Sequence, residues 1–359
     1  MTATPDYIVT TGDFIAEWME EEGINAAELS RRLGVTPKHV SELLRGIAPL
    51  SHAHALGLER VTGIPARIWN QYESGYREDL ARAHEDVQLA AQYDEAKAFP
   101  LAYLRKWRFI TVPARNRADT VRQLLGLLGV ATLDAWKTTW REGSVAYRRA
   151  AIARNNAPAL AIWLSLAERH HDGVPDLADF DRDAVRELVP QIRRLTRQDP
   201  VEAIAETTRL LQAAGVVLCF TPPVPGLGIH GVTRWINGHP VVQLSLLFKT
   251  DDQLWFTIFH ELGHVLLHGD KELYVEGEET LAEREADEFA TEALIPGSYR
   301  DRLPPARDVA RVRALADELG IAPSIVLGQA QRATRDYAWG HELKVKVEFA
   351  THSHGGDNE

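Results

Sequence analysis

The stretch Phe259-His260-Glu261-Leu262-Gly263-His264-Val265-Leu266-Leu267-His268 decides how this chain of 359 residues is interpreted. Its first two histidines are four residues apart, so on a helix both imidazoles lie on one face, about 6 Å apart along the axis. Two imidazoles at that separation can bind a single zinc ion. Glu261 lies just off that line, where a carboxylate can hold a water molecule without being a ligand. The spacing therefore predicts a hydrolytic zinc site; the alternative is a helix with two surface histidines.

A zinc site with two histidines needs a third protein ligand, because catalytic zinc usually takes three and keeps one position for water. Residues 280–296 read as a helix on which Glu283 and Asp287 share a face. We expect Glu283 to bind the metal and Asp287 to accept a hydrogen bond from a ligand histidine. Glu285 points away from Glu283 by about 200° and is not an equal choice. The alternative is a capping box, in which Glu283 bonds the helix terminus at Thr280.

A third histidine, His268, continues the row, but it would lie about 12 Å along the axis from His260 and cannot share one ion with both of the others. It either supports the site or contacts substrate, or it is a partly buried structural histidine. A hydrolytic site also needs a group that stabilises the developing oxyanion. The candidates for that group are His230, Arg234, His239, His268 and Tyr274.

Composition limits the class of protein. The length indicates two or three domains, and the proportions of apolar (45%) and charged (25%) residues are those of a soluble globular protein. The sequence has neither a membrane-spanning run nor a signal peptide, so we expect a cytoplasmic protein that does not contact membranes. Cys219 is the only cysteine, which excludes disulfides within the chain and leaves histidine and carboxylate as metal ligands.

The N-terminal region reads as short helices separated by glycine and proline. Residues 26–33 form one helix, Gly34-Val35-Thr36 turns the chain, and residues 37–45 form the next. Two helices joined by such a turn predict a helix-turn-helix, whose second helix enters the DNA major groove. The side chains that this arrangement offers to DNA are Thr36, Lys38, His39, Ser41, Glu42 and Arg45.

Charge supports DNA binding only locally. Between Arg31 and Arg45 the chain has four basic residues and one acidic residue, whereas residues 1–80 have seven basic and twelve acidic residues. The formal charge of the whole chain is −11, which argues against broad nonspecific binding to DNA. A helical protein-interaction module is therefore the alternative for this region.

A change of pattern at Gly215 marks the start of the C-terminal part. Residues 216–220 form a β-rich run, and residues 229–236 and 240–244 are strand-like, with the hairpin signal Asn237-Gly238 between them. These segments predict a small antiparallel sheet before the helix that carries the two histidines. An extended peptide could add to this sheet near residues 241–244.

Two motifs resemble known families. His260-Glu261-Leu262-Gly263-His264, with Glu283-x-x-Ala286-Asp287-x-Phe289-Ala290 and Leu294-Ile295-Pro296 after it, resembles the ImmA/IrrE-type metallopeptidases over residues 215–327. Residues 27–36 and 40–46 resemble the Cro/repressor (XRE) class of helix-turn-helix in its HigA antitoxin-like branch, although Ser30 stands where alanine is commoner. The first resemblance implies that His260, His264 and Glu283 bind one zinc ion per chain and that Glu261 is the catalytic carboxylate.

The resemblances also imply an architecture. The fold class is α+β and mainly helical, with a five-helix helix-turn-helix bundle at residues 1–75 and a helical connector at residues 76–213. A zincin-like metallopeptidase domain with a small antiparallel sheet follows at residues 214–350.

Proteins with both parts are regarded as stress or phage-linked regulators that cleave a repressor or an antitoxin. The resemblance therefore implies two partners, operator DNA and a protein substrate that is itself a regulator. One alternative is a HigA-like antitoxin or repressor whose zinc domain is a sensor with little proteolytic activity. In another, both regions are protein-interaction modules. Helix-turn-helix repressors commonly act as dimers, so we expect a homodimer.

Overall fold

The computed structural model describes residues 8–142, 156–175, 177–245, 247, 250–269, 274–275, 280–304 and 307–347. The chain divides into two compact units, each taken by itself below. One comprises Met1–Tyr93 and Pro113–Arg122, and the other comprises Asp94–Val112 and Gln123–Glu359. Across the residues described, none of the helices has both the length and the apolar character required to cross a bilayer.

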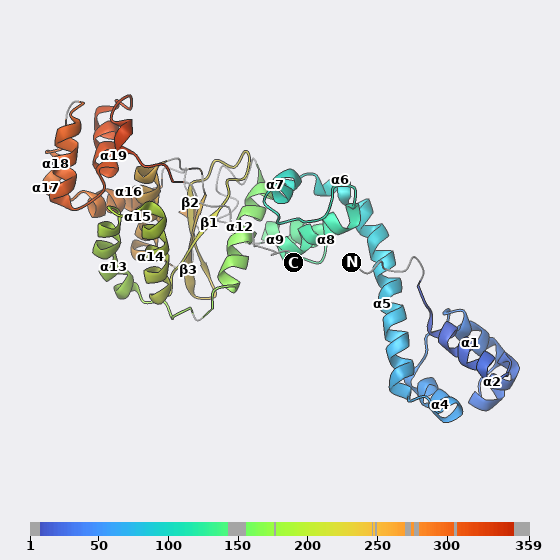
Figure 1. The fold of residues 1–359 in the computed structure, drawn as a ribbon. Helices are drawn as coiled ribbons and strands as arrows, with labels where there is room; N and C mark the ends of the chain where they lie inside the picture. Colours follow the sequence, from blue (N-terminus) through green and yellow to red (C-terminus); the bar gives the residue numbers. More distant parts are fainter. Residues whose placement is uncertain are drawn as a thin grey trace, which may run out of the picture. The chain divides into compact units, whose positions relative to one another are not determined.

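The N-terminal unit contains the expected five-helix bundle (Figure 1). Its helices are α1 (Thr11–Glu21), α2 (Ala26–Leu33), α3 (Pro37–Leu44), α4 (His52–Thr62) and α5 (Ala66–Ala91). The bundle core includes Ile15, Leu29, Val40, Leu58 and Trp69, each almost fully buried. Each of the five helices contributes one of these side chains, and in α1 the buried residues Ile15, Trp18 and Met19 recur at helical spacing, so the helix buries one apolar face.

The turn between α2 and α3 follows from its residues. Gly34 ends α2 in the left-handed region, with φ of 69°, where glycine carries no steric penalty. Thr36 then caps α3, because its side chain accepts a hydrogen bond from the backbone N–H of His39. Pro37 occupies the first turn of α3, where its missing N–H costs nothing.

Further helices follow the bundle in the described part of the chain. They are α6 (Tyr93–Ala96), α7 (Leu101–Lys106), α8 (Arg117–Leu128), α9 (Leu133–Glu142), α12 (Ala157–Asp172), α13 (Arg182–Leu195), α14 (Pro200–Ala213), α15 (Asp251–Leu267), α16 (Leu281–Leu294), α17 (Gly297–Arg300), α18 (Val309–Leu319), α19 (Pro323–Thr334) and the 3-10 helix η1 (His341–Leu343). Helix α5 has 26 residues and runs through residue 75, where we placed a domain boundary.

The sheet is mixed, which corrects the antiparallel sheet expected from the sequence. Its strands are β1 (Val217–Thr221), β2 (Gly231–Ile236), β3 (His239–Ser245) and β4 (Tyr274–Val275), in the order β1-β3-β2-β4. The turn at Asn237-Gly238 joins β2 and β3 as an antiparallel hairpin, with positive φ at both residues, as its sequence predicts. Strand β1, however, pairs with β3 in parallel.

This order also corrects the expected place for a substrate strand. Residues 241–244 pair with β1 on one side and with β2 on the other, so both sets of their main-chain groups are already used. An additional strand needs a sheet edge with unpaired main-chain groups. Strand β3 has no such edge at these residues.

Helices cover both faces of the sheet (Figure 1). Ala167 of α12 packs with Val217, Cys219 and Val241 on one face. The other face, which includes Val242, packs against α14 and α15 in the main core of this unit. Successive side chains on a strand point to opposite faces, so each residue of β2 faces either α12 or α15.

Candidate metal centre

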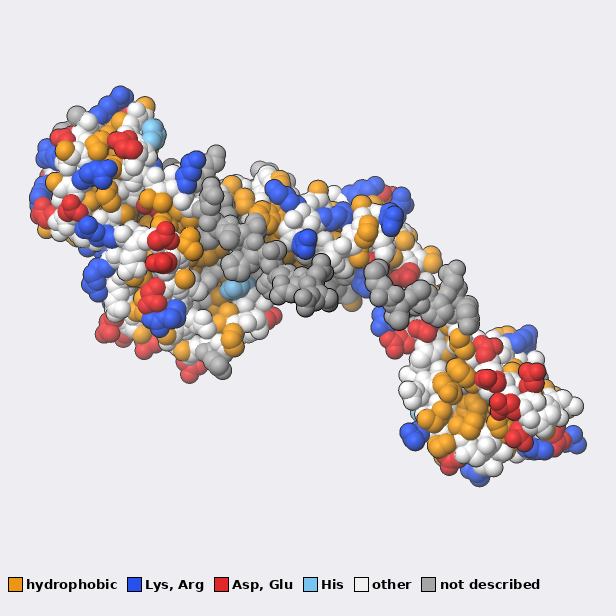
Figure 2. All heavy atoms as spheres, viewed as in Figure 1, with side chains coloured by type: hydrophobic (Ala, Val, Ile, Leu, Met, Phe, Trp, Pro, Cys, Tyr) orange, Lys and Arg blue, Asp and Glu red, His pale blue; other side chains and the backbone are white. Residues whose placement is uncertain are grey.

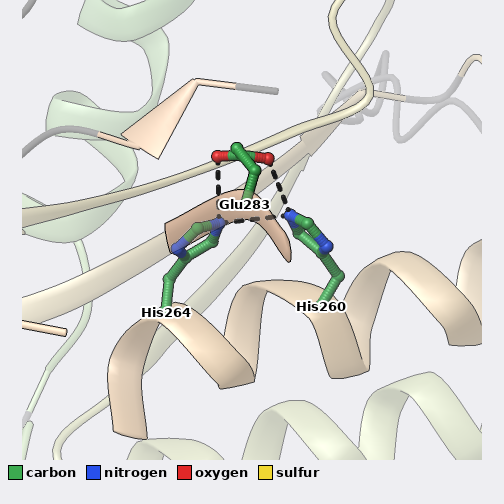
Figure 3. Close-up of side chains that lie close together, drawn as sticks. All are labelled: His260, His264 and Glu283. Atoms are coloured by element: carbon green, nitrogen blue, oxygen red, sulfur yellow. Dashed lines mark hydrogen bonds and ion pairs between the residues drawn. The ribbon is translucent and has the colours of Figure 1, made fainter. Parts of the chain in front are cut away.

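Helix α15 carries the histidine motif and is buried along most of its length. His260 and His264 lie one turn apart, and their Nε2 atoms are 3.1 Å apart. Phe259, Leu262 and Val265, between and beyond them, are fully buried and fix the rotation of the helix. The motif therefore presents both imidazoles in one direction, as its spacing predicts (Figure 3).

Glu283 faces these imidazoles from α16. Its Oε2 lies 3.2 Å from His260 Nε2, and its Oε1 lies 3.2 Å from His264 Nε2 (Figure 3). The backbone N–H of Glu283 donates to the Thr280 hydroxyl, which caps the helix. Thr280 thus caps α16 through the backbone of Glu283, while the carboxylate of Glu283 is directed at the histidines.

The two helices approach closely because small residues meet between them. A Cβ added to Gly263 would lie 3.0 Å from the Cα of Ala286 and 3.2 Å from the ring of Phe289. Glycine and alanine at these positions let the backbones come together. This contact brings the first turn of α16, with Glu283, to the histidines of α15.

Further side chains hold the two imidazoles in place. His260 Nδ1 lies 3.0 Å from Asp287 Oδ1, and Asp287 in turn contacts Arg332 Nη2 at 3.3 Å. His264 Nδ1 lies 3.0 Å from His268 Nδ1, and His268 Nε2 lies 3.0 Å from Glu285 Oε2. Both histidines therefore have their second ring nitrogen occupied, which fixes ring orientation in metal sites.

The electrostatics of the cluster favour an ionised carboxylate beside the histidines. Burial by itself would raise the pKa of Glu283, but its hydrogen bonds with His260 and His264 outweigh burial and lower the pKa to about 2. Burial lowers the pKa of His264, and its contacts with Glu283 offset this only in part. For His260, burial also favours a lower pKa, yet Asp287 and Glu283 together raise it to about 10.

Glu261 faces β2 instead of joining the cluster. Its side chain is buried, and its Oε2 accepts a hydrogen bond of 2.6 Å from the hydroxyl of Thr233. A Cβ added to Gly231 would lie 2.3 Å from Glu261 Oε1, so any other residue there would require the carboxylate to shift. The local sequence patterns did not indicate these roles for Thr233 and Gly231, because both contacts join residues about 30 positions apart.

The structure separates the oxyanion candidates. Thr233 faces Glu261 on α15, so its neighbour Arg234 faces α12, where it contacts Glu168 Oε1 at 2.7 Å. His239 contacts the carbonyl of Gly215 and packs near His171 of α12. Arg234 and His239 are therefore on the face of the sheet opposite the histidine motif.

The remaining oxyanion candidates are His230, His268 and Tyr274. His230 lines a pocket on α15 and adjoins Gly231. His268 contacts His264 and Glu285, as described above. The side chain of Tyr274 lies outside the described residues.

The residues that we expected to contact DNA lie on or beside α3. Thr36, Lys38 and Arg45 are exposed, and Ser41 and Glu42 are half-buried. His39 turns toward α4, where its Nε2 lies 3.2 Å from His54 Nδ1. Acidic and basic side chains are intermixed on the visible face of this unit (Figure 2), in keeping with its composition.

The cluster has the composition of a metal centre. Among the described residues, His260, His264 and Glu283 form the group whose ligand atoms all lie within 4.8 Å of one another. Two imidazole nitrogens and one carboxylate are a ligand set used by catalytic zinc sites, which leave one position open. The residues present therefore fit a zinc ion.

Comparison with known proteins agrees with both motifs. Residues 211–351 match the family model for the IrrE N-terminal-like domain of peptidase family M78, and residues 15–69 match a helix-turn-helix family model. No curated protein matches the chain. The chain thus joins a helix-turn-helix domain to an IrrE N-terminal-like domain of the M78 peptidases, the architecture that its sequence motifs predict.

Proposed function

We propose that this chain is a zinc-dependent endopeptidase joined to a DNA-binding domain, and that its substrate is another transcriptional regulator such as a repressor or an antitoxin. One observation carries the enzymatic part of the proposal. The side chains of His260, His264 and Glu283 converge on one point. The buried carboxylate of Glu261, beside His260 in the sequence, instead accepts a hydrogen bond from Thr233. A metal sensor has no evident need for that carboxylate, whereas a hydrolase needs a general base.

In this proposal each residue of the centre has one task. His260, His264 and Glu283 would hold the zinc ion, and Asp287 and His268 would orient the two imidazoles. A bound zinc ion supplies positive charge that polarises a water molecule and the scissile carbonyl. Glu261 takes the proton of that water and later delivers it to the leaving amine.

Two contacts support Glu261 in this role. The hydroxyl of Thr233 donates to one carboxylate oxygen and fixes the side chain. Gly231 leaves room for the other oxygen. The buried surroundings, which include Leu262 and Ile258, keep bulk water away from the base. His230, beside Gly231, is the residue that we favour for stabilising the oxyanion.

One of the two edges of the sheet lies on the side of Glu261. In the described part of the chain, β4 pairs with Val232 and Thr233 of β2 and forms the outer strand on the side of the Glu261 contact. Main-chain hydrogen bonds along a sheet edge are a general way to hold a peptide. We place the substrate along the β2–β4 side of the sheet.

Cleavage of candidate repressor proteins tests this function. Glu261→Gln keeps the shape of the side chain but removes its ability to accept the proton. We expect it to retain zinc and to cleave slower than the unmodified chain by about 10²-fold to 10⁴-fold. Equal cleavage by the two zinc-loaded chains, measured by gel and mass spectrometry, would contradict the assignment of Glu261. Zinc binding with no cleavage by either chain would instead favour the alternative in which the zinc domain is a sensor.

A further inference from the structure

A pocket of about 330 Å³ adjoins the metal centre in the C-terminal unit. Four of its lining residues, Asp252, Gln253, Phe256 and Thr257, come from the first two turns of α15, before His260. The ring of Phe256 lies 6.5 Å from that of His260, centroid to centroid. The pocket is therefore within reach of a substrate residue next to the bond that would be cleaved.

A second connection runs through α19. Arg332 lines the pocket, and its guanidinium lies over the ring of Phe256 at 5.5 Å. The same guanidinium contacts Asp287, which contacts His260. Arg332 therefore forms part of the pocket wall and, through Asp287, also contacts the side chain that orients His260.

The walls of the pocket are mainly apolar. Phe256 of α15 and Tyr337, after α19, contribute aromatic surface, and the buried Leu294 and Ile325 lie behind it. A concave surface of this kind gains free energy when an apolar side chain displaces water from it. Its volume is large enough for a leucine, methionine or phenylalanine side chain.

The charged side chains around the pocket already form ion pairs with other side chains of the protein. Lys344 Nζ lies 2.7 Å from Asp252 Oδ2, and both side chains are largely buried. Arg332 is paired with Asp287. A charged substrate side chain would have to compete with these pairs, which makes it a poorer occupant than an apolar one.

We propose that this pocket is the specificity subsite of the peptidase and that it takes a large apolar side chain from the residue beside the scissile bond. The inference rests on the proposed function, because it assigns substrate preference to the same centre. It assigns the apolar walls to Phe256 and Tyr337, backed by the buried Leu294 and Ile325, and it places Gln253 and Gln329 where added bulk would fill the space.

Binding of hydroxamates to the zinc-loaded, full-length chain tests the subsite without requiring turnover. Two peptide hydroxamates share one backbone and carry either an isobutyl group or a hydrogen at the position next to the zinc-binding group. Calorimetry should show the isobutyl compound binding tighter by roughly tenfold or more. Gln329→Trp should reduce that ratio to about twofold or less, because the indole occupies the pocket.

Matched variants keep the test decisive. Ala333→Trp adds the same indole to an exposed position of α19 outside the pocket lining and should preserve the preference. Gln253→Trp, at an exposed lining residue of α15, replaces Gln329→Trp if that variant does not fold. Equal binding of the two hydroxamates, or a preference that survives both pocket variants, would overturn the subsite alone. If neither hydroxamate binds the zinc-loaded chain, the proposed peptidase itself is contradicted.

Discussion

Gly231 lies where strand β2 passes the carboxylate of Glu261. Gly231→Ala would place a Cβ 2.3 Å from a carboxylate oxygen of the buried Glu261. We expect the carboxylate to be displaced and cleavage to fall by at least about tenfold, since general-base catalysis depends on hydrogen-bond reach. Zinc content should stay at one ion per chain, because the substitution leaves all three proposed ligands in place.

The matched control is Gly75→Ala, at a helical glycine with open space around its Cα. Alanine there should leave cleavage unchanged and raise helix stability by up to about 1 kcal/mol. Unchanged cleavage by Gly231→Ala, measured beside this control, would show that Glu261 does not need the glycine.

The sequence could predict the residues of the centre that depend on local spacing. The interval between His260 and His264 sets their common face, and the interval between Glu283 and Asp287 sets theirs. Thr233, Gly231 and Arg332 act through contacts between distant parts of the chain. Such contacts depend on how β2, α15 and α19 pack together. Local patterns in a single sequence do not reveal that packing.

At the scale of elements, the packing of α3 on α4 brings two imidazoles together. Burial and the nearby charge of His39 lower the pKa of His54 from its ordinary value of 6.5. When pH falls below 6.5, the unfolded chain therefore takes up a proton at His54 before the folded chain does. The stability of the folded unit should accordingly fall with pH, from about 6.5 down to the lowered pKa of His54.

Titration of the His54 ring by nuclear magnetic resonance, in the full chain, measures this directly. We expect a pKa below 6.5, and we expect His39→Gln to move it upward because the neighbouring charge is removed. A pKa of 6.5 or higher in the unmodified chain would show that the α3–α4 contact does not penalise the charged imidazole.

Some elements could be predicted from the sequence better than others. The bundle helices carry their own signals, such as Gly34 at the end of α2 and Thr36 before α3. The Asn237-Gly238 turn likewise specifies the hairpin of β2 and β3. No local sequence signal indicates which edge of that hairpin β1 joins. The parallel pairing of β1 with β3 could therefore not be predicted.

At the scale of the whole molecule, the net charge of −11 means that DNA binding must depend on few basic side chains. Lys38 is 84% exposed on α3, and Arg45 is exposed at its end. We expect Lys38→Ala and Arg45→Ala each to weaken binding of the full chain to its upstream DNA. Each should also reduce the slope of log affinity against log salt by about 1 if the residue contacts a phosphate.

Arg82→Ala is the control for this prediction, because it removes the same charge from an exposed position of α5, away from α3. It should leave affinity and salt slope unchanged. If neither Lys38→Ala nor Arg45→Ala weakens binding more than Arg82→Ala does, α3 is not the recognition helix.

The account depends most on the three side chains that converge from α15 and α16, so the most direct test is zinc stoichiometry in the purified full-length chain. We predict one zinc ion per unmodified chain and per Glu261→Gln chain, measured by mass spectrometry of the metal. His264→Ala and Glu283→Ala should lose that ion, since each removes one ligand of three. Retention of stoichiometric zinc by both alanine variants, or its loss from Glu261→Gln, would contradict the account.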